Sequence, residues 1–221
     1  MAEPELQQEA PREAPRPRIF QIGFNKCGTR SLYAFLKGSG IESAHFNRGR
    51  LAQTIHDNIE AGRKPLWGVE RYTAYTDMQV VARDGVIEAF KYFREFHRYY
   101  PGSRFILNTR GKEGWIKSRV NHGAGFFVQR YQRALGLADE DAVLAHWSQD
   151  WDRHHADVAS FFADKPGQLL VFDIEQHGPE RLVDFLAPEF ETDARLYGHA
   201  GDTAKVDPEQ YRRNRGRKAG G

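Results

Sequence analysis

The segment spanning residues 19–40 constrains the fold most, because it has the pattern of a strand, a turn and a helix in immediate succession. Residues 19–24 form a short apolar run that is typical of a buried strand. A turn containing Gly28 follows, and residues 31–37 then show the apolar spacing of a helix. Glycines at 38 and 40 supply a C-cap for that helix.

The same alternation of strand and helix patterns continues along the chain. Further strands are predicted at residues 41–46, 65–69, 104–109 and 168–173. Helices are predicted at residues 51–61, 85–100, 112–121, 125–135, 139–164 and 179–186. Strands that alternate with helices are joined by right-handed crossovers and form parallel sheets. We therefore predict an α/β fold whose mainly parallel central sheet is covered by helices on both faces.

The length of 221 residues fits one domain flanked by tails. Residues 1–18 are rich in Pro and Glu and have nothing to bury, which predicts a disordered leader. The folded domain is predicted over residues 19–200. Residues 201–221 form a basic C-terminal tail, with five Lys or Arg residues between 212 and 218.

Composition excludes several classes of protein. The chain has 32 Lys and Arg residues against 30 Asp and Glu residues, and this balance disfavours a nucleic-acid partner. No apolar run reaches the roughly 20 residues of a membrane helix, and the N-terminus lacks a signal-peptide pattern, so we predict no transmembrane segment and a cytoplasmic location. Cys27 is the single cysteine, which excludes an internal disulfide and a cysteine-based metal site.

A candidate phosphate loop, residues 23–31, lies between the first strand and its helix. Free backbone N–H groups and the helix dipole favour an anion at such a position. The spacing from Gly23 to Gly28 fits the start of the GxxxxGK[ST] motif, but Thr29 stands where the motif has lysine, and the loop carries Lys26 instead. We also expect no acidic strand end for Mg²⁺, so an ordinary ATPase or kinase is disfavoured. A glycine turn without a ligand is the alternative.

These residues resemble a known family. Residues 26–32, KCGTRSL, are similar to the 5′-phosphosulfate loop K-x-G-T-x-x-L of sulfotransferases that use 3′-phosphoadenosine 5′-phosphosulfate (PAPS). Arg110 at a strand end, with Ser118 eight positions later in a helix, is similar to the family's 3′-phosphate site. Here Arg-Gly-Lys stands where the family commonly has Arg-Asp-Pro. Residues 169–186 resemble the family's late strand and helix.

The resemblance implies a P-loop-like three-layer α/β/α fold and a metal-independent enzyme of the bacterial-type or heparan-type branch. It implies transfer of a sulfuryl group from PAPS to a hydroxyl or an amine of a small-molecule, lipid or carbohydrate acceptor. The residues expected to bind PAPS are Lys26, Cys27, Gly28, Thr29, Arg30, Ser31, Arg110 and Ser118, with Arg215 and Arg217 of the basic tail. For Cys27, a tolerated small loop residue is the alternative role.

Two catalytic roles follow from the chemistry of sulfuryl transfer. Lys26 is expected to stabilise the charge that develops on the leaving phosphate oxygen. The acceptor hydroxyl needs a general base, for which His45 is the first candidate because its ordinary pKa is about 6.5, and Glu42 is the second. Glu70 and Asp77 are lower-ranked candidates.

Two other functions remain open from the sequence. One is a P-loop nucleotide kinase or NTPase with an irregular phosphate loop, and the other is a nucleotide-binding scaffold without catalysis. A metal site at His146, His154 and His155 is disfavoured, because no two of them are four residues apart on a helix. We expect this segment to pack on the sheet through its tryptophans.

Overall fold

The computed structural model describes residues 17–198 except 84 and 188. Five strands form the central sheet: β1 (Ile19–Gln21), β2 (Ser43–His45), β3 (Ala74–Thr76), β6 (Arg104–Thr109) and β7 (Leu169–Asp173). Two more, β4 (Gln79–Val81) and β5 (Val86–Glu88), form a hairpin. The α-helices are α1 (Thr29–Gly38), α2 (Arg50–Glu60), α3 (Phe93–Tyr99), α4 (Lys112–Val120), α5 (Phe126–Leu135), α6 (Glu140–Phe162) and α7 (Glu180–Leu186).

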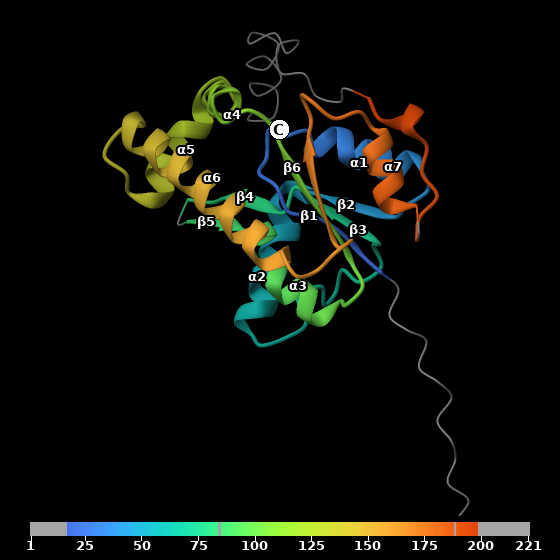
Figure 1. The fold of residues 1–221 in the computed structure, drawn as a ribbon. Coiled ribbons are helices and arrows are strands. Elements are labelled where there is room, and N and C mark those ends of the chain that lie inside the picture. Colours follow the sequence, from blue (N-terminus) through green and yellow to red (C-terminus); the bar gives the residue numbers. More distant parts are fainter. Residues whose placement is uncertain (1–16, 84, 188, 199–221) are drawn as a thin grey trace, which may run out of the picture.

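The five-stranded sheet is parallel throughout, which confirms the predicted α/β class. Its strand order is β2-β3-β1-β6-β7, so that β1 lies at the centre, with β3 on one side and β6 on the other (Figure 1). The longest pairing joins β6 to β7, from Phe105 opposite Leu169 to Thr109 opposite Asp173. The β4–β5 hairpin is antiparallel and lies outside this sheet.

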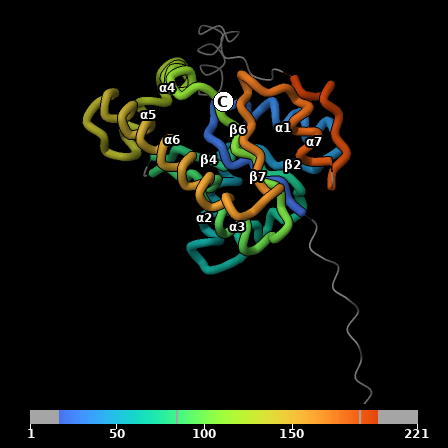
Figure 2. The backbone as a smooth tube through the Cα atoms, in the orientation of Figure 1, coloured from blue at the N-terminus to red at the C-terminus, as the bar shows by residue number. Residues whose placement is uncertain are grey.

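Successive side chains along each strand point to opposite faces of the sheet, and this divides the hydrophobic core into two parts. In β1, Ile19 packs with the side chains of α1 and α7, whereas Phe20 packs with α2, α3 and α6. In β6, Phe105 and Ile106 are divided in the same way. The helices therefore cover both faces and make three layers, with α1 and α7 on one side of the sheet and the remaining helices on the other (Figures 1 and 2).

The structure corrects two predicted elements. Residues 65–69, predicted as a strand, form turns, and the third strand of the sheet is instead β3, eight residues downstream of Leu66. Residues 85–100, predicted as one helix, contain β5, a short 3-10 helix (Ala89–Lys91) and α3. Strands of three residues are too short for a period-2 pattern to stand out from the flanking apolar residues.

Most of the predicted leader and all of the predicted tail lie outside the described residues. The leader up to residue 16 and the tail from residue 199 are not described, so the proposed roles of Arg215 and Arg217 stay predictions. Arg18 belongs to the folded part, because its carbonyl accepts a hydrogen bond from the Arg104 backbone N–H (2.8 Å) beside β1. Within the described part of the chain, no helix has both the length and the apolar character needed to cross a membrane.

We predict that Gly23→Ala lowers the free energy of unfolding by about 3 kcal/mol, the upper part of the range for overpacked cores. A Cβ atom at Gly23 would lie 2.1 Å from the Asn108 carbonyl oxygen, so β1 and β6 would have to move apart. Urea denaturation measures the loss. Gly85→Ala is the matched control, because a Cβ there meets no atom within 4 Å and the backbone is not left-handed. Equal losses in both variants would contradict the prediction.

Candidate functional site

The candidate site lies at the carboxyl edge of the parallel sheet. The phosphate loop follows β1, His45 ends β2, Asp77 follows β3, and Arg110 follows β6. Because parallel strands end at one edge of the sheet, these four segments meet there, as ligand-binding segments do in open α/β sheets. The structure thus brings together predicted residues that are up to 84 positions apart, from Lys26 to Arg110.

The phosphate loop has a backbone suited to an anion. Lys26 and Gly28 adopt left-handed conformations, with φ of 67° and 76°. Such residues curl a loop so that successive N–H groups point inward, which is how anion-binding nests form. Gly28 is also the N-cap of α1 and has no side chain to cap the first turn, so the helix N–H groups face the loop. Thr29 and Ser31 are buried in that turn, whereas Arg30 is exposed.

A chain of buried side-chain amides fixes the loop to the neighbouring strands. Gln21 donates to the Asn108 Oδ1 atom (2.6 Å), and the Asn108 amide nitrogen donates to the Cys27 carbonyl (2.6 Å). The Gln21 Oε1 atom accepts a hydrogen bond from the Asp77 backbone N–H (2.7 Å). These three bonds connect the ends of β3, β1 and β6 with the phosphate loop. Cys27 itself is fully buried, and burial raises the pKa of its thiol, which disfavours a nucleophilic role.

Helix α4 holds the loop from the other side. The Trp115 indole N–H donates to the Asn25 carbonyl (3.0 Å), and the Arg119 Nε atom donates to the Asn25 Oδ1 atom (2.9 Å). Arg119 is fully buried, and its charge is balanced by Glu88 on β5, with 3.6 Å between Nη2 and Oε1. Several rings surround the Arg119 guanidinium group within 5.6 Å of their centroids: Phe24, Trp115, Phe127, Tyr131 and Trp147.

Arg110 has the geometry of an anion ligand at the end of β6. Its Nη2 atom pairs with the Glu175 Oε1 atom (2.5 Å), while the other Glu175 oxygen accepts from the Gly111 N–H (3.0 Å). The Arg110 Nε atom is buried and has no hydrogen-bond partner among the described residues. This N–H group is able to donate to an oxygen atom of a ligand or of water. A Cβ on Gly114 would lie 3.5 Å from Arg110, and Ser118 is one helical turn further on the same face of α4, half-buried.

Lys26 and Asp77 form the charged centre of the site. Burial lowers the pKa of Lys26, and the Asp77 carboxylate opposes that effect. Burial raises the pKa of Asp77 to about 6, against the positive charges of Lys26 and Arg119. Asp77 also has a left-handed backbone (φ 52°), which turns the chain out of β3 at the carboxyl edge. A carboxyl group with a pKa near neutrality is suited to general base catalysis.

His45 lies beside Asp77, with 3.8 Å between the Nε2 and Oδ2 atoms. The Thr76 hydroxyl donates to the Ala44 carbonyl (3.0 Å), so its oxygen accepts from the His45 Nδ1–H (2.9 Å). This assignment places the proton on Nδ1 and leaves the Nε2 lone pair facing Asp77. Burial, and to a smaller extent the charge of Arg30, lowers the pKa of His45 to about 4, so the ring is neutral at pH 7.

The other two predicted base candidates lie at the opposite edge of the sheet. Glu42 precedes β2, and its carbonyl accepts hydrogen bonds from Thr73 and Ala74 at the amino end of β3. Glu70 also precedes β3, and its carboxylate accepts from the Gly68 N–H (2.7 Å). Both side chains are exposed. The structure therefore does not bring Glu42 or Glu70 to the phosphate loop, whereas His45 and Asp77 lie at the carboxyl edge.

Two features of the site differ from what the sequence predicted. Asp77, a lower-ranked candidate base, follows β3 directly, and this contradicts the expectation that no strand end carries an acidic residue. The short strand β3 was not predicted. His122, after α4, lies close enough to Lys26 for that charge to affect it. Burial and, to a smaller extent, the charge of Lys26 lower the pKa of His122 to about 4. The Nδ1 atom of His122 is buried without a partner among the described residues.

The histidines of α6 have structural partners. The His154 Nε2 atom bonds to the Ile22 carbonyl (2.7 Å), and His155 lies between the Thr109 hydroxyl and the Trp151 carbonyl (3.0 and 2.8 Å). Over residues 17–198, apart from 84 and 188, no group of three His, Cys, Asp or Glu residues is arranged to hold a metal ion.

Comparison with known families agrees with this geometry. The model of the sulfotransferase domain family matches residues 18–149, more than half of the chain. The chain belongs to the sulfotransferase family. The matched segment includes Lys26, Asp77, Arg110 and Ser118, whereas β7 and α7 lie beyond it. A sulfotransferase domain transfers sulfuryl groups from a sulfonate donor. No curated protein matches this chain in a sequence search.

We predict that Asp77→Asn stabilises the protein at pH 7. The pKa of Asp77 is raised from 3.8 to about 6, so the folded state favours the protonated carboxyl, and stability is lost as the pH rises through about 6. The neutral amide removes this cost, which is up to about 3 kcal/mol. Urea denaturation at pH 4 and pH 7 measures it: the gain is expected at pH 7 and not at pH 4. The exposed Asp184→Asn is the control, and equal gains at both pH values would contradict the prediction.

Proposed function

We propose that this sulfotransferase moves a sulfuryl group from PAPS to a hydroxyl or an amine of a small acceptor. The observation that carries the proposal is the pair of anion-binding positions on one sheet edge: the phosphate loop with Lys26, and Arg110 with its unpartnered Nε atom. PAPS carries a 5′-phosphosulfate and a 3′-phosphate, and in this proposal each position binds one of these groups. The family supports the transfer of a sulfuryl group in general.

The donor is held through its charges in this proposal. The loop N–H groups and the start of α1 receive the 5′-phosphosulfate, while Arg110 and Ser118 receive the 3′-phosphate. Glu175 holds the Arg110 guanidinium group in position through Nη2, which leaves Nε for the ligand. Cys27 contributes its backbone and not its thiol, since the side chain is fully buried.

Lys26 acts on the leaving group. As the S–O bond breaks, the bridging oxygen of the 5′-phosphate gains negative charge, and a positioned ammonium group stabilises that charge more in the transition state than in the ground state. Lys26 has a left-handed backbone, which is unusual for a residue with a side chain. The phosphate loop keeps this strained conformation at the position where the proposed mechanism needs the ammonium group.

Asp77 is the general base that we propose, with His45 beside it. The acceptor hydroxyl gives its proton to the Asp77 carboxylate, whose pKa of about 6 is close to working pH. His45 is neutral and has a pKa of about 4, which makes it a weaker base than Asp77. Its Nε2 lone pair is able to accept a hydrogen bond. This order reverses the one that the sequence suggested.

A P-loop kinase is the competing function that Asp77 favours, because an acidic residue at a strand end is able to hold Mg²⁺. Calorimetry separates the two functions. We expect 3′,5′-bisphosphoadenosine, the desulfated donor, to bind without metal and more tightly than ATP with Mg²⁺. Tight Mg²⁺-dependent ATP binding with no affinity for the bisphosphate would overturn the proposal.

We predict that Arg110→Ala weakens binding of 3′,5′-bisphosphoadenosine by ten- to a hundredfold, because a charge-assisted hydrogen bond is worth about 1.5–3 kcal/mol. Adenosine 5′-phosphate lacks the 3′-phosphate, so its affinity is expected to stay the same. Isothermal titration of both ligands gives the ratio. Arg98→Gln, at an exposed position on α3, is the charge-matched control. Equal losses for the two ligands would refute the assignment of Arg110 to the 3′-phosphate.

We predict that sulfuryl transfer depends on the ionisation of Asp77. The rate constant kcat/KM is expected to fall about tenfold per pH unit below pH 6, and Asp77→Asn to reduce it by about 10²–10⁴-fold. Release of the bisphosphate is measured with the first phenol, sugar or lipid alcohol that supports turnover. The His45→Gln variant is expected to keep the fall of kcat/KM below about pH 6. If kcat/KM instead falls near pH 4, and this fall disappears in His45→Gln, His45 is the base.

A further inference from the structure

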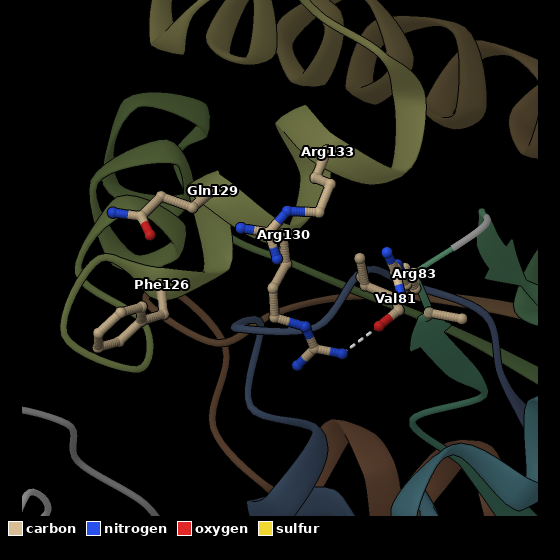
Figure 3. A pocket seen from close by; sticks show the side chains of 7 residues that line it. Val81, Arg83, Phe126, Gln129, Arg130 and Arg133 are labelled. Carbon is tan, nitrogen blue, oxygen red and sulfur yellow. Dashed lines mark hydrogen bonds between the residues drawn. The ribbon is translucent and has the colours of Figure 1, made fainter.

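A groove of about 600 Å³ opens between the β4–β5 hairpin and α5 (Figure 3). Its lining residues come from the end of β4 and from one face of α5: Val81, Ala82, Arg83, Phe126, Gln129, Arg130 and Arg133. A second hollow of about 550 Å³ continues along α5 and shares Gln129 and Arg133 with the first. None of these residues belongs to the phosphate loop or to the site at Arg110 and Ser118.

The groove is strongly basic. Three of its lining residues are arginines, and none of the lining residues is acidic. Arg130 reaches across from α5 and donates to the Val81 carbonyl, as Figure 3 shows, whereas Arg83 and Arg133 form no ion pair with a described residue. Like charges gathered at one hollow repel each other unless an anion lies among them. Guanidinium groups are also the side chains best matched to carboxylate, sulfate and phosphate oxygens.

The groove is built from segments that follow Asp77 and His122 closely in the chain. β4 begins two residues after Asp77, and α5 begins four residues after His122. The His122 ring packs against Phe127 of α5, with 5.0 Å between centroids. Lys26 and Arg130 both lower the pKa of His122, so this ring lies within reach of both charges. Arg110, the proposed 3′-phosphate ligand, follows β6 on the other side of β1 from β3.

We propose that the groove binds an anionic group of the acceptor, so that the acceptor is an acidic molecule carrying a carboxylate, sulfate or phosphate group besides the hydroxyl or amine that is sulfated. This inference rests on the proposed function and adds the substrate class. Arg83 and Arg133 bind the anion, while Arg130 is held in place by its bond to Val81. Phe126, 49% exposed, offers a ring against which the body of the acceptor packs.

The test uses the full-length protein with saturating 3′,5′-bisphosphoadenosine and four fluorescent probes that share one aromatic body. These are methylumbelliferyl phosphate, sulfate and β-glucuronide, and the neutral methylumbelliferyl β-glucoside. Equilibrium dialysis is expected to show at least one anionic probe binding about tenfold more tightly than the glucoside. The order of the three anions identifies which acidic group the groove prefers.

The double variant Arg83→Gln and Arg133→Gln is expected to remove this preference, with about tenfold weaker binding of the anionic probes. Both side chains are exposed, so the fold is expected to tolerate the change. The matched control, Lys64→Gln with Arg98→Gln, removes the same charge at exposed positions near the amino edge of the sheet. The proposal is overturned if the anionic probes bind no more tightly than the glucoside, or if the double variant keeps the preference.

The same titrations separate this inference from the proposed function. If the wild-type protein binds the bisphosphate but shows no preference for an anionic probe, the acidic acceptor alone is refuted. Failure of the wild-type protein to bind the bisphosphate refutes the donor assignment, while probe binding without nucleotide then still reports on the groove.

Discussion

The site depends on a short chain of buried amide hydrogen bonds that starts at Gln21. This side chain accepts from the Asp77 backbone and donates to Asn108, which in turn holds the Cys27 carbonyl of the phosphate loop. Substitution of one of these amide side chains would therefore displace both Asp77, the proposed base, and the phosphate loop. Buried hydrogen-bond networks of this kind destabilise the fold when a polar group lacks its partner, and they are rigid when every group is satisfied. Gly23 allows Asn108 to approach β1, since only a residue without a side chain fits against the Asn108 carbonyl.

The sequence predicted the parts of the site that local patterns encode. Lys26 and Gly28 lie in one turn between a strand and a helix, and Arg110 and Ser118 are separated by a fixed spacing at the start of another helix. Residue type and position within one strand–turn–helix unit are sufficient for such predictions. The direction of β2 is a further reason to rank His45 over Glu42, because a parallel sheet places its ligands at the carboxyl ends of the strands.

The rest of the site depends on tertiary structure. Asp77 was only a lower-ranked candidate, because its place at the carboxyl edge depends on β3, a strand of three residues that carries almost no periodicity. Arg119 follows Ser118 in α4 and looks like an ordinary helical arginine, yet the fold buries it among aromatic rings and uses it to hold Asn25. His122 lies in a turn whose position depends on the packing of α4 and α5. No local pattern distinguishes these three residues from their neighbours.

Complete burial of Cys27 has a consequence for the chemistry of the whole chain. Oxidants and alkylating agents act on thiolates that solvent reaches, and this thiol is neither ionised at neutral pH nor exposed. Because Cys27 is the single cysteine of the sequence, the folded protein presents no reactive sulfhydryl group to its surroundings. The phosphate loop is thereby insulated from the redox state of its compartment, although a cysteine stands at its centre.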